Sequence, residues 1–94
     1  MFKSGGYNVY PREVEDALLA HPGVAEVAVV GLASDEWGET VVAFVVPAAG
    51  PVDTEVLLEH AAGRLAKYKR PRDVRYVESL PRNALGKVLK HELS

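Results

Sequence analysis

Residues 24–47 read VAEVAVVGLASDEWGETVVAFVVP, and this stretch decides the fold. It contains two valine-rich runs, Val24–Leu32 and Val41–Pro47, which have the length and the β-branched composition of strands. Neither run alternates cleanly between apolar and polar residues, so we expect both strands to be covered on both faces. The polar link between them, residues 33–39, predicts a hairpin loop in which Trp37 is the one large apolar residue.

The segments on either side predict helices that pack against these strands. Pro11 suits the first position of a helix, where its missing N–H costs nothing, and Pro22-Gly23 end that helix. A second helix follows a loop at residues 48–51, with Asp53 or Thr54 as its cap. Apolar spacing typical of a helix marks the buried faces. These positions are Val14, Ala17, Leu18 and His21 in the first helix, and Leu57, Ala61 and Leu65 in the second.

Three shorter segments complete the predicted order of elements. Residues 1–10 form an extended piece that turns at Gly5-Gly6, and residues 73–77 alternate as a third strand. Residues 87–93 form a last short helical stretch. We therefore predict an α+β fold: a small, largely antiparallel three-stranded sheet with helices packed against it, plus a short N-terminal β-turn or hairpin.

The composition favours one compact domain. The chain has 94 residues, of which 48% are hydrophobic and 26% charged, so it is long enough to bury a core. It has no cysteine, which excludes disulfides, thiol chemistry and zinc fingers. No apolar run approaches the roughly 20 residues of a membrane span, and residues 1–10 do not resemble a signal peptide. We expect a cytoplasmic protein with no membrane span.

Charge divides the chain into an acidic and a basic part. Residues 1–63 carry two basic and ten acidic side chains, whereas residues 64–94 carry nine basic and three acidic ones. Such asymmetry is typical of a protein whose basic end meets an anionic partner. It is equally compatible with a basic solvated face that the acidic half balances in space, so charge alone leaves both interpretations open.

Gly86-Lys87 and the residues before it form the first candidate site. A phosphate-binding P-loop needs G-x-x-x-x-G-K-[ST]. Pro81 stands where the first glycine should be and Val88 follows the lysine, which excludes that motif. What remains is a loop that begins at Pro81 and presents one lysine at the start of a helix. By local chemistry alone, a solvated lysine beside a turn glycine is the favoured interpretation.

Two further candidate sites contain aromatic residues. Trp37 either folds back over the sheet edge or offers its flat face to a ring such as adenine, and local chemistry favours packing. Residues 68–72, Tyr-Lys-Arg-Pro-Arg, suit ring stacking plus phosphate pairing, but local chemistry favours a polar loop between a helix and a strand. The three histidines lie far apart in the sequence with no carboxylate at ligand spacing, so we predict no metal site.

Five fragments occur in an order and spacing that identify a family. They are Lys3–Glu15, His21–Val24, Asp35–Glu39, Tyr68–Pro71 and Leu80–Lys90. With them the chain resembles, essentially from end to end, the C-terminal domain of the adenylate-forming (AMP-binding) acyl-CoA synthetases and ligases. The relatives of that family include the adenylation domains of peptide synthetases and firefly luciferase.

The resemblance implies that residues 1–94 are the mobile lid of a larger ligase whose N-terminal ATP- and acyl-binding domain is absent. That enzyme would join an acid to the CoA thiol, with ATP and CoA as substrates and Mg expected at the N-terminal domain. In its first half-reaction a carboxylate attacks the ATP α-phosphate, and Lys87 matches the catalytic lysine. Lys87 also matches a site that a lysine acetyltransferase modifies in relatives. The isolated lid is expected to be inactive and to bind neither substrate tightly.

In the second half-reaction, the resemblance implies that the domain turns about a hinge and that the CoA thiol takes the acyl group. Gly5 and Gly6 would then line a narrow channel for the pantetheine arm. Lys3 matches a position that helps this step in some relatives. Four residues match positions that hold the CoA nucleotide in some ligases of the family: Trp37, Tyr68, Arg70 and Arg72.

Two alternatives stay open beside a fatty-acid or aryl CoA ligase. One is the lid of an adenylation domain that loads a carrier protein, although Trp37 and the basic pair favour CoA by resemblance. The other is a non-catalytic module whose basic end binds an anionic partner. The expected partners are the N-terminal adenylation domain and CoA, and not nucleic acid. The acyl substrate is not readable, because its pocket belongs to the other domain.

Overall fold

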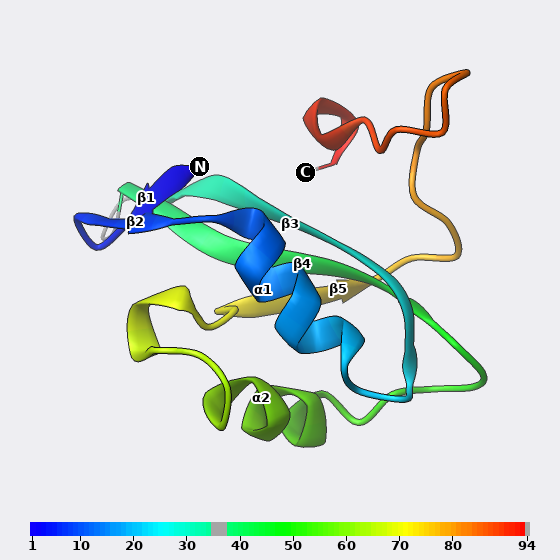
Figure 1. Cartoon of the computed structure of the whole chain (residues 1–94), viewed down its shortest axis with the longest axis horizontal. Coiled ribbons are helices and arrows are strands. Elements are labelled where there is room, and N and C mark those ends of the chain that lie inside the picture. Colours follow the sequence, from blue (N-terminus) through cyan, green and yellow to red (C-terminus); the bar gives the residue numbers. More distant parts are fainter. Residues whose placement is uncertain (35–37, 94) are drawn as a thin grey trace.

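The computed structural model describes residues 1–34 and 38–93 (Figure 1). In chain order, the elements are β1 (Phe2–Ser4), β2 (Tyr7–Val9), α1 (Pro11–Leu19), β3 (Val24–Ser34), β4 (Gly38–Pro47), α2 (Thr54–Ala62), the 3₁₀ helix η1 (Lys67–Lys69), β5 (Asp73–Tyr76) and the 3₁₀ helix η2 (Lys90–Glu92). The predicted α+β class is confirmed. Within the described ranges, no helix has the length and apolar content needed to cross a membrane.

β4 is the central strand of the sheet. It pairs antiparallel with β3 along its whole length, from Gly38 opposite Ser34 to Pro47 opposite Val24. On its other side, β4 pairs antiparallel with β1 and parallel with β5. β1 and β2 form the expected N-terminal hairpin, which joins the sheet through Ser4 opposite Gly38. β3 is therefore left at one edge of the sheet.

Both α-helices cover the same face of the sheet (Figure 1). Val14 and Leu18 of α1 and Leu57 and Ala61 of α2 are fully buried there, as their helical spacing predicts. They pack with apolar residues of the strands into one core. The Asp53 carboxylate accepts hydrogen bonds from two backbone N–H groups in the first turn of α2, so Asp53 is the cap.

The opposite face of the sheet is covered by the C-terminal segment, residues 77–93. A second cluster of buried residues fills this face: Ala28, Val30, Val42, Phe44, Leu80 and Leu93. Both β3 and β4 therefore have one apolar face against the helices and another against this segment. This confirms the burial expected from runs that do not alternate.

Polar contacts tie the C-terminal segment to the edge strand β3. The Glu15 carboxylate of α1 accepts a hydrogen bond from the backbone N–H of Val29 at 2.9 Å and pairs with Lys90 Nζ at 2.9 Å. The Arg82 guanidinium pairs with Glu26, another β3 residue. One carboxylate thus satisfies a backbone donor of the edge strand, and two ion pairs fix the course of the segment across it.

The predicted helical stretch over residues 87–93 is wrong. Only Lys90–Glu92 form a 3₁₀ turn, and Lys87 comes before it, next to Val88, which pairs with Arg82 in an isolated β-bridge. The backbone N–H and the backbone carbonyl of Lys87 both bond to Asn83, at 3.0 Å each. Because the backbone groups of Lys87 are taken by this turn, Lys87 does not begin a helix.

Candidate functional site

A groove opens between the β1–β2 turn and η1. It has a volume of about 770 Å³, and two segments far apart in the sequence line it. The lining residues are Ser4, Gly5, Tyr7, Lys67, Tyr68, Arg70, Pro71 and Arg72. β4 brings the segments together, because it pairs with β1 and because the Val41 carbonyl accepts a hydrogen bond from the backbone N–H of Arg72 at 2.8 Å.

The turn between β1 and β2 depends on its two glycines. The backbone angle φ is 57° at Gly5 and 85° at Gly6, in the left-handed region that two-residue hairpin turns use. A Cβ at Gly6 would meet nothing within 4 Å. Backbone conformation, and not a lack of space, therefore requires glycine at this position.

Two tyrosines, one from each segment, stack at the groove. The ring centroids of Tyr7 and Tyr68 lie 4.8 Å apart, and the ring planes are inclined by 28°. Tyr68 packs against the core beneath it, whereas the residue Tyr7 is 60% exposed. The stack therefore has a fixed inner ring and an outer ring that can receive a further flat ring.

Basic side chains surround the groove, and Arg70 among them has partners at the end of α2 and just beyond it. Arg70 Nε donates to the Leu65 carbonyl at 2.9 Å, and Arg70 Nη2 donates to the Ala62 carbonyl at 3.2 Å. Its guanidinium thus ties the loop after η1 to the end of α2. Lys67 and Arg72 are exposed in the wall of the groove.

Lys69 ties the same loop to α1. Its ammonium lies 2.7 Å from Glu13 Oε1 and 5.5 Å from the centroid of the Tyr68 ring. The hydrogen bond that Lys69 donates to Glu13 raises the pKa of Lys69 above its ordinary value, against the opposing effect of burial. η1 is therefore fixed to both helices, and the wall of the groove that it forms is held in place.

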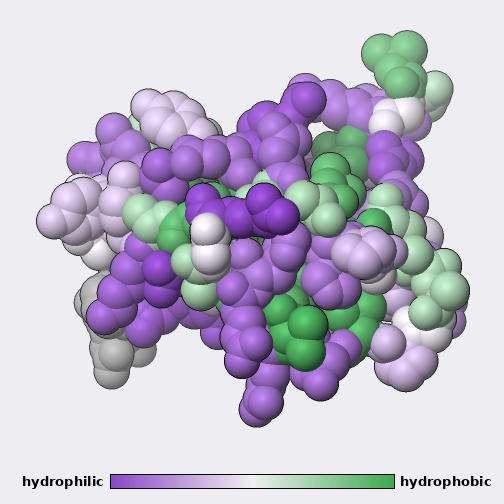
Figure 2. Space-filling model, turned by 60° about the horizontal axis from the view of Figure 1, so that its bottom comes forward, coloured by the Kyte–Doolittle hydropathy of each residue, from purple (hydrophilic) through white to green (hydrophobic). Residues whose placement is uncertain are grey.

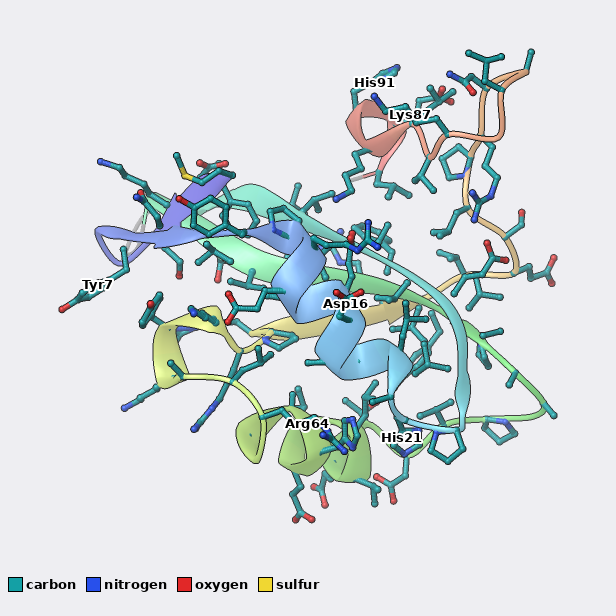
Figure 3. All side chains as sticks on the ribbon, in the orientation of Figure 1. Tyr7, Asp16, His21, Arg64, Lys87 and His91 are labelled. Atoms are coloured by element: carbon teal, nitrogen blue, oxygen red, sulfur yellow. The ribbon has the colours of Figure 1, made fainter. Side chains whose placement is uncertain are left out.

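Lys87 lies in a separate turn, which projects from the C-terminal segment (Figure 1). Residues 82–87 are all exposed, and Leu85 beside the lysine is 92% exposed. Within the described part of the chain, Lys87 forms no ion pair. Figure 3 shows Tyr7 at the left edge of the molecule and Lys87 at the top, well apart from it.

The structure gathers most of the residues predicted to contact CoA and separates Lys87 from them. Gly5, Tyr68, Arg70 and Arg72 all line the groove, with Gly6 next to them in the turn. Lys3 is exposed on β1, opposite Asn8 of β2. Trp37 lies outside the described residues. Two segments that the sequence separates by about sixty positions thus form one surface.

Three lining residues, Ser4, Tyr7 and Lys67, received no role from the sequence. The sequence did contain a signal for Tyr7: it directly follows Gly5-Gly6, and a residue next to a tight turn lies close to whatever the turn lines. Lys67 carried no such signal. Its position in the groove depends on the contacts that hold η1 to the helices.

Two histidines that are distant in the sequence meet beside the helices. The rings of His21 and His60 lie 5.4 Å apart, edge to face. His21 Nδ1 accepts a hydrogen bond from the Gly23 backbone N–H, and His60 Nε2 lies 2.8 Å from the Ala17 carbonyl of α1. α1 ends at Leu19, so His21 lies beyond the helix in which it was predicted. No three metal-ligating side chains gather among the residues described.

The surface carries single apolar side chains rather than one broad apolar area. Figure 2 shows a face that is mostly hydrophilic, with separate hydrophobic areas. The exposed large apolar residues are Met1, Tyr7, Tyr10, Leu19, Val56, Tyr76 and Leu85. Scattered residues of this kind are ordinary on protein surfaces, so the groove and the Lys87 turn remain the two candidate sites.

Comparison with known proteins gives close relatives in sequence. Residues 13–87 match the family described as AMP-binding enzyme C-terminal domain. A 2-succinylbenzoate–CoA ligase of Bacillus cereus is 49% identical over 90 residues, and a long-chain-fatty-acid–CoA ligase of Mycobacterium tuberculosis is 47% identical over 90 residues. Both matches cover 96% of this chain but only 18% of the relative.

A solved structure of a relative has the same fold as this chain. The Mycobacterium tuberculosis fatty acyl CoA synthetase matches with a TM-score of 0.94 and 46% sequence identity. The match covers 99% of this chain and 18% of that one. This chain therefore spans less than a fifth of the length of these relatives, whose names specify different acids.

Proposed function

This chain belongs to the family of AMP-binding enzyme C-terminal domains, and from that membership we propose that it is the C-terminal domain of an ATP-dependent acyl- or aryl-CoA ligase. Similarity to CoA ligases along almost the whole chain supports this proposal. Such a ligase forms acyl-AMP from a carboxylate and ATP, and then transfers the acyl group to the thiol of CoA. In the proposal a larger domain holds ATP and the acid, and this domain supplies groups to both steps.

Lys87 serves the first half-reaction. A carboxylate oxygen attacks the α-phosphorus of ATP, the bond to the bridging oxygen breaks, and pyrophosphate leaves with that electron pair. Negative charge concentrates where the two anions meet, so an ammonium placed there stabilises the transition state. The projecting, exposed turn supports this role, because it can carry the charge into a site on another domain.

The groove serves the second half-reaction, in which the CoA sulfur bonds to the acyl carbon, AMP leaves, and the thiol proton passes to solvent. The exposed face of the tyrosine stack suits the adenine ring. Lys67 and Arg72 suit the phosphates of CoA. The Gly5-Gly6 turn offers the pantetheine arm a backbone surface without side chains.

Three other residues that the resemblance singled out, Lys3, Trp37 and Arg70, have separate roles in the proposal. Lys3, exposed on β1, keeps its assignment to the second half-reaction, and Trp37 keeps its predicted contact with the CoA nucleotide. Arg70 acts on CoA through the groove wall, because its two described hydrogen bonds go to the backbone carbonyls of Ala62, which ends α2, and Leu65, just beyond it.

The observation that carries the proposal is the separation of the two surfaces. The groove lies between η1 and the β1–β2 turn, whereas Lys87 belongs to the C-terminal segment, and Figure 3 shows Lys87 well apart from Tyr7 of the groove. Acyl-AMP is made and consumed at one place, so both surfaces must reach that place in turn. The domain therefore has to rotate between the half-reactions.

Separate assays of the two half-reactions test the proposal in the ligase that contains this domain. Lys87→Ala is expected to lower acyl-AMP formation about 10²–10³-fold and to spare transfer from preformed acyl-AMP to CoA. Arg72→Ala is expected to raise the KM for CoA by about tenfold or more, with pyrophosphate release unchanged. Arg12→Ala is the matched control, because Arg12 is exposed on α1 and pairs with Asp16 there.

The assays also separate the alternatives. Equal losses in both half-reactions for Lys87→Ala would reject its role in adenylation. If Arg72→Ala leaves the CoA dependence unchanged while a carrier protein accepts the acyl group, the domain serves a carrier-protein adenylation enzyme. Chemical acetylation of Lys87 removes the same charge, so the acetylated ligase should behave as the alanine variant does.

A further inference from the structure

One side chain builds the turn that carries Lys87. Asn83 Oδ1 accepts hydrogen bonds from the backbone N–H groups of Leu85 at 2.9 Å and Lys87 at 3.0 Å. The Asn83 backbone adds two hydrogen bonds of 3.0 Å each. Its N–H donates to the Lys87 carbonyl, and its carbonyl accepts from the Gly86 N–H. Gly86 has φ of 83°, which lets the chain reverse inside this set of bonds.

Arg82 anchors the turn to the sheet. Its Nη1 donates to the Gly86 carbonyl at 2.7 Å, and its Nη2 pairs with Glu26 of β3. The side chains of Arg82 and Glu26 are each 42% exposed. Because a guanidinium is planar and rigid, holding both partners at once sets the turn at one place relative to β3.

Packing does not hold this turn, since every residue from 82 to 87 is exposed. A surface turn without buried contacts ordinarily opens easily. Exposed hydrogen bonds also add little to global stability, because water competes for the same groups. The polar contacts of the turn therefore fix a local shape more than they stabilise the fold.

We propose that Asn83 and Arg82 are positioning residues that hold the Lys87 backbone at a fixed place and direction for the adenylation step. The inference rests on the proposed function of Lys87. Asn83 sets the shape of the turn, and Arg82 sets where the turn stands on the domain. A lysine presented in this way meets the reacting anions without a further search of backbone conformations.

The test uses variants of the ligase that contains this domain. Asn83→Ala removes the side-chain acceptor without changing charge, and it is expected to lower acyl-AMP formation about a hundredfold, the effect of a small misplacement. Transfer from preformed acyl-AMP to CoA should be unchanged. Asn83→Ser keeps a short acceptor that can bond the same N–H groups, so it should restore most of the lost activity.

A second readout follows the turn itself. Hydrogen exchange in the peptide that spans residues 83–88 should be faster in Asn83→Ala and should slow again in Asn83→Ser. Arg82→Ala should also lower acyl-AMP formation. Arg75→Ala is its control, because Arg75 makes a similarly exposed ion pair with Asp73 elsewhere on the domain, and it should leave acyl-AMP formation unchanged.

Different outcomes of these assays would overturn the positioning role of Asn83 and Arg82 and the proposed function of Lys87. If Lys87→Ala leaves acyl-AMP formation intact, the proposed function and the inference both fall. If Lys87→Ala blocks that step but Asn83→Ala and Arg82→Ala do not, only the positioning inference is overturned. Equal losses in both half-reactions for Asn83→Ala, or no recovery with serine, would also overturn it, because a structural role alone would explain them.

Discussion

Arg70 donates one hydrogen bond to the carbonyl of Ala62, the last residue of α2, and another to the carbonyl of Leu65, just beyond the helix. The last carbonyls of a helix lack partners within it, and hydrogen bonds from a charged donor are stronger than neutral ones. We therefore expect Arg70→Ala to lower the free energy of unfolding by ~2–3 kcal/mol, measured by urea unfolding.

Arg12→Ala is the control for Arg70→Ala, because it removes an exposed ion pair spaced four residues apart on α1. Its expected cost is only ~0.5 kcal/mol. If both variants unfold at the same urea concentration, the Arg70 guanidinium does not hold the end of α2.

Lys69 and Glu13 predict a dependence of stability on pH. Glu13 raises the pKa of Lys69 in the folded chain above its ordinary value of 10.5, so the folded state binds this proton more tightly than the unfolded state does. The pair therefore stabilises the fold fully below pH 10.5, and the contribution is lost as the pH rises through the raised pKa. Urea unfolding at pH 8 and at several values above the ordinary pKa measures this loss.

Glu13→Gln is the reference for the Lys69 experiment, since it removes the carboxylate and leaves the other titrating groups in place. The difference in stability between the wild type and Glu13→Gln should shrink at high pH. A difference that stays constant through that range would show that the pair is not formed in solution.

At the scale of elements, β3 and the N-terminal hairpin meet at Gly31. A Cβ there would lie 2.6 Å from the Phe2 ring and 2.9 Å from Glu39 Oε2. Gly31→Ala should therefore push Phe2 and the hairpin outward and destabilise the chain by ~1–3 kcal/mol, as measured by urea unfolding. Because the hairpin carries Gly5, the KM of the ligase for CoA should rise as well.

A double variant checks the Gly31 prediction. Phe2→Leu in the Gly31→Ala background makes room for the new methyl group and should recover part of the stability. No recovery would mean that the contact with Glu39, and not the one with Phe2, sets the cost.

The elements were predictable where burial and composition agreed. Strands β3 and β4 follow from valine-rich runs that are apolar on both faces, and α2 follows from Asp53 and the spacing of Leu57 and Ala61. The helix predicted over residues 87–93 does not form, because the backbone N–H and carbonyl of Lys87 are both hydrogen-bonded to Asn83. Nothing in a local pattern shows that a side chain four residues earlier will compete with a helix.

At the scale of the molecule, we predict that the 94-residue chain folds alone but catalyses nothing. Its two apolar clusters cover both faces of the sheet, which supports cooperative unfolding. ATP and the acid bind elsewhere in the proposed ligase, so no acyl-CoA should form from ATP, a carboxylate and CoA. Calorimetry and a thioester assay on the pure chain measure both, and turnover by that chain would contradict the proposal.

The sequence placed the candidate residues but not their arrangement. The resemblance pointed to Lys87, Gly5 and Tyr68, yet only the fold shows that Gly5 and Tyr68 share a groove while Lys87 lies in a separate turn, away from it. The direction of a side chain is equally hidden from the sequence. Residues 68–72 show three basic residues, and long-range packing decides that Lys69 bonds to α1 and Arg70 to α2.

The Glu15 contact with the edge strand also bears on self-association. β3 is long and rich in valine, and no strand among the described residues pairs with its outer side; such an edge can recruit a strand from a second molecule into an intermolecular sheet. The Glu15 carboxylate accepts the hydrogen bond of the Val29 N–H there, and Lys90 pairs with the same carboxylate oxygen. An incoming strand would have to displace a charged group at this position, so we expect Glu15 and Lys90 to oppose pairing of β3 with a second molecule.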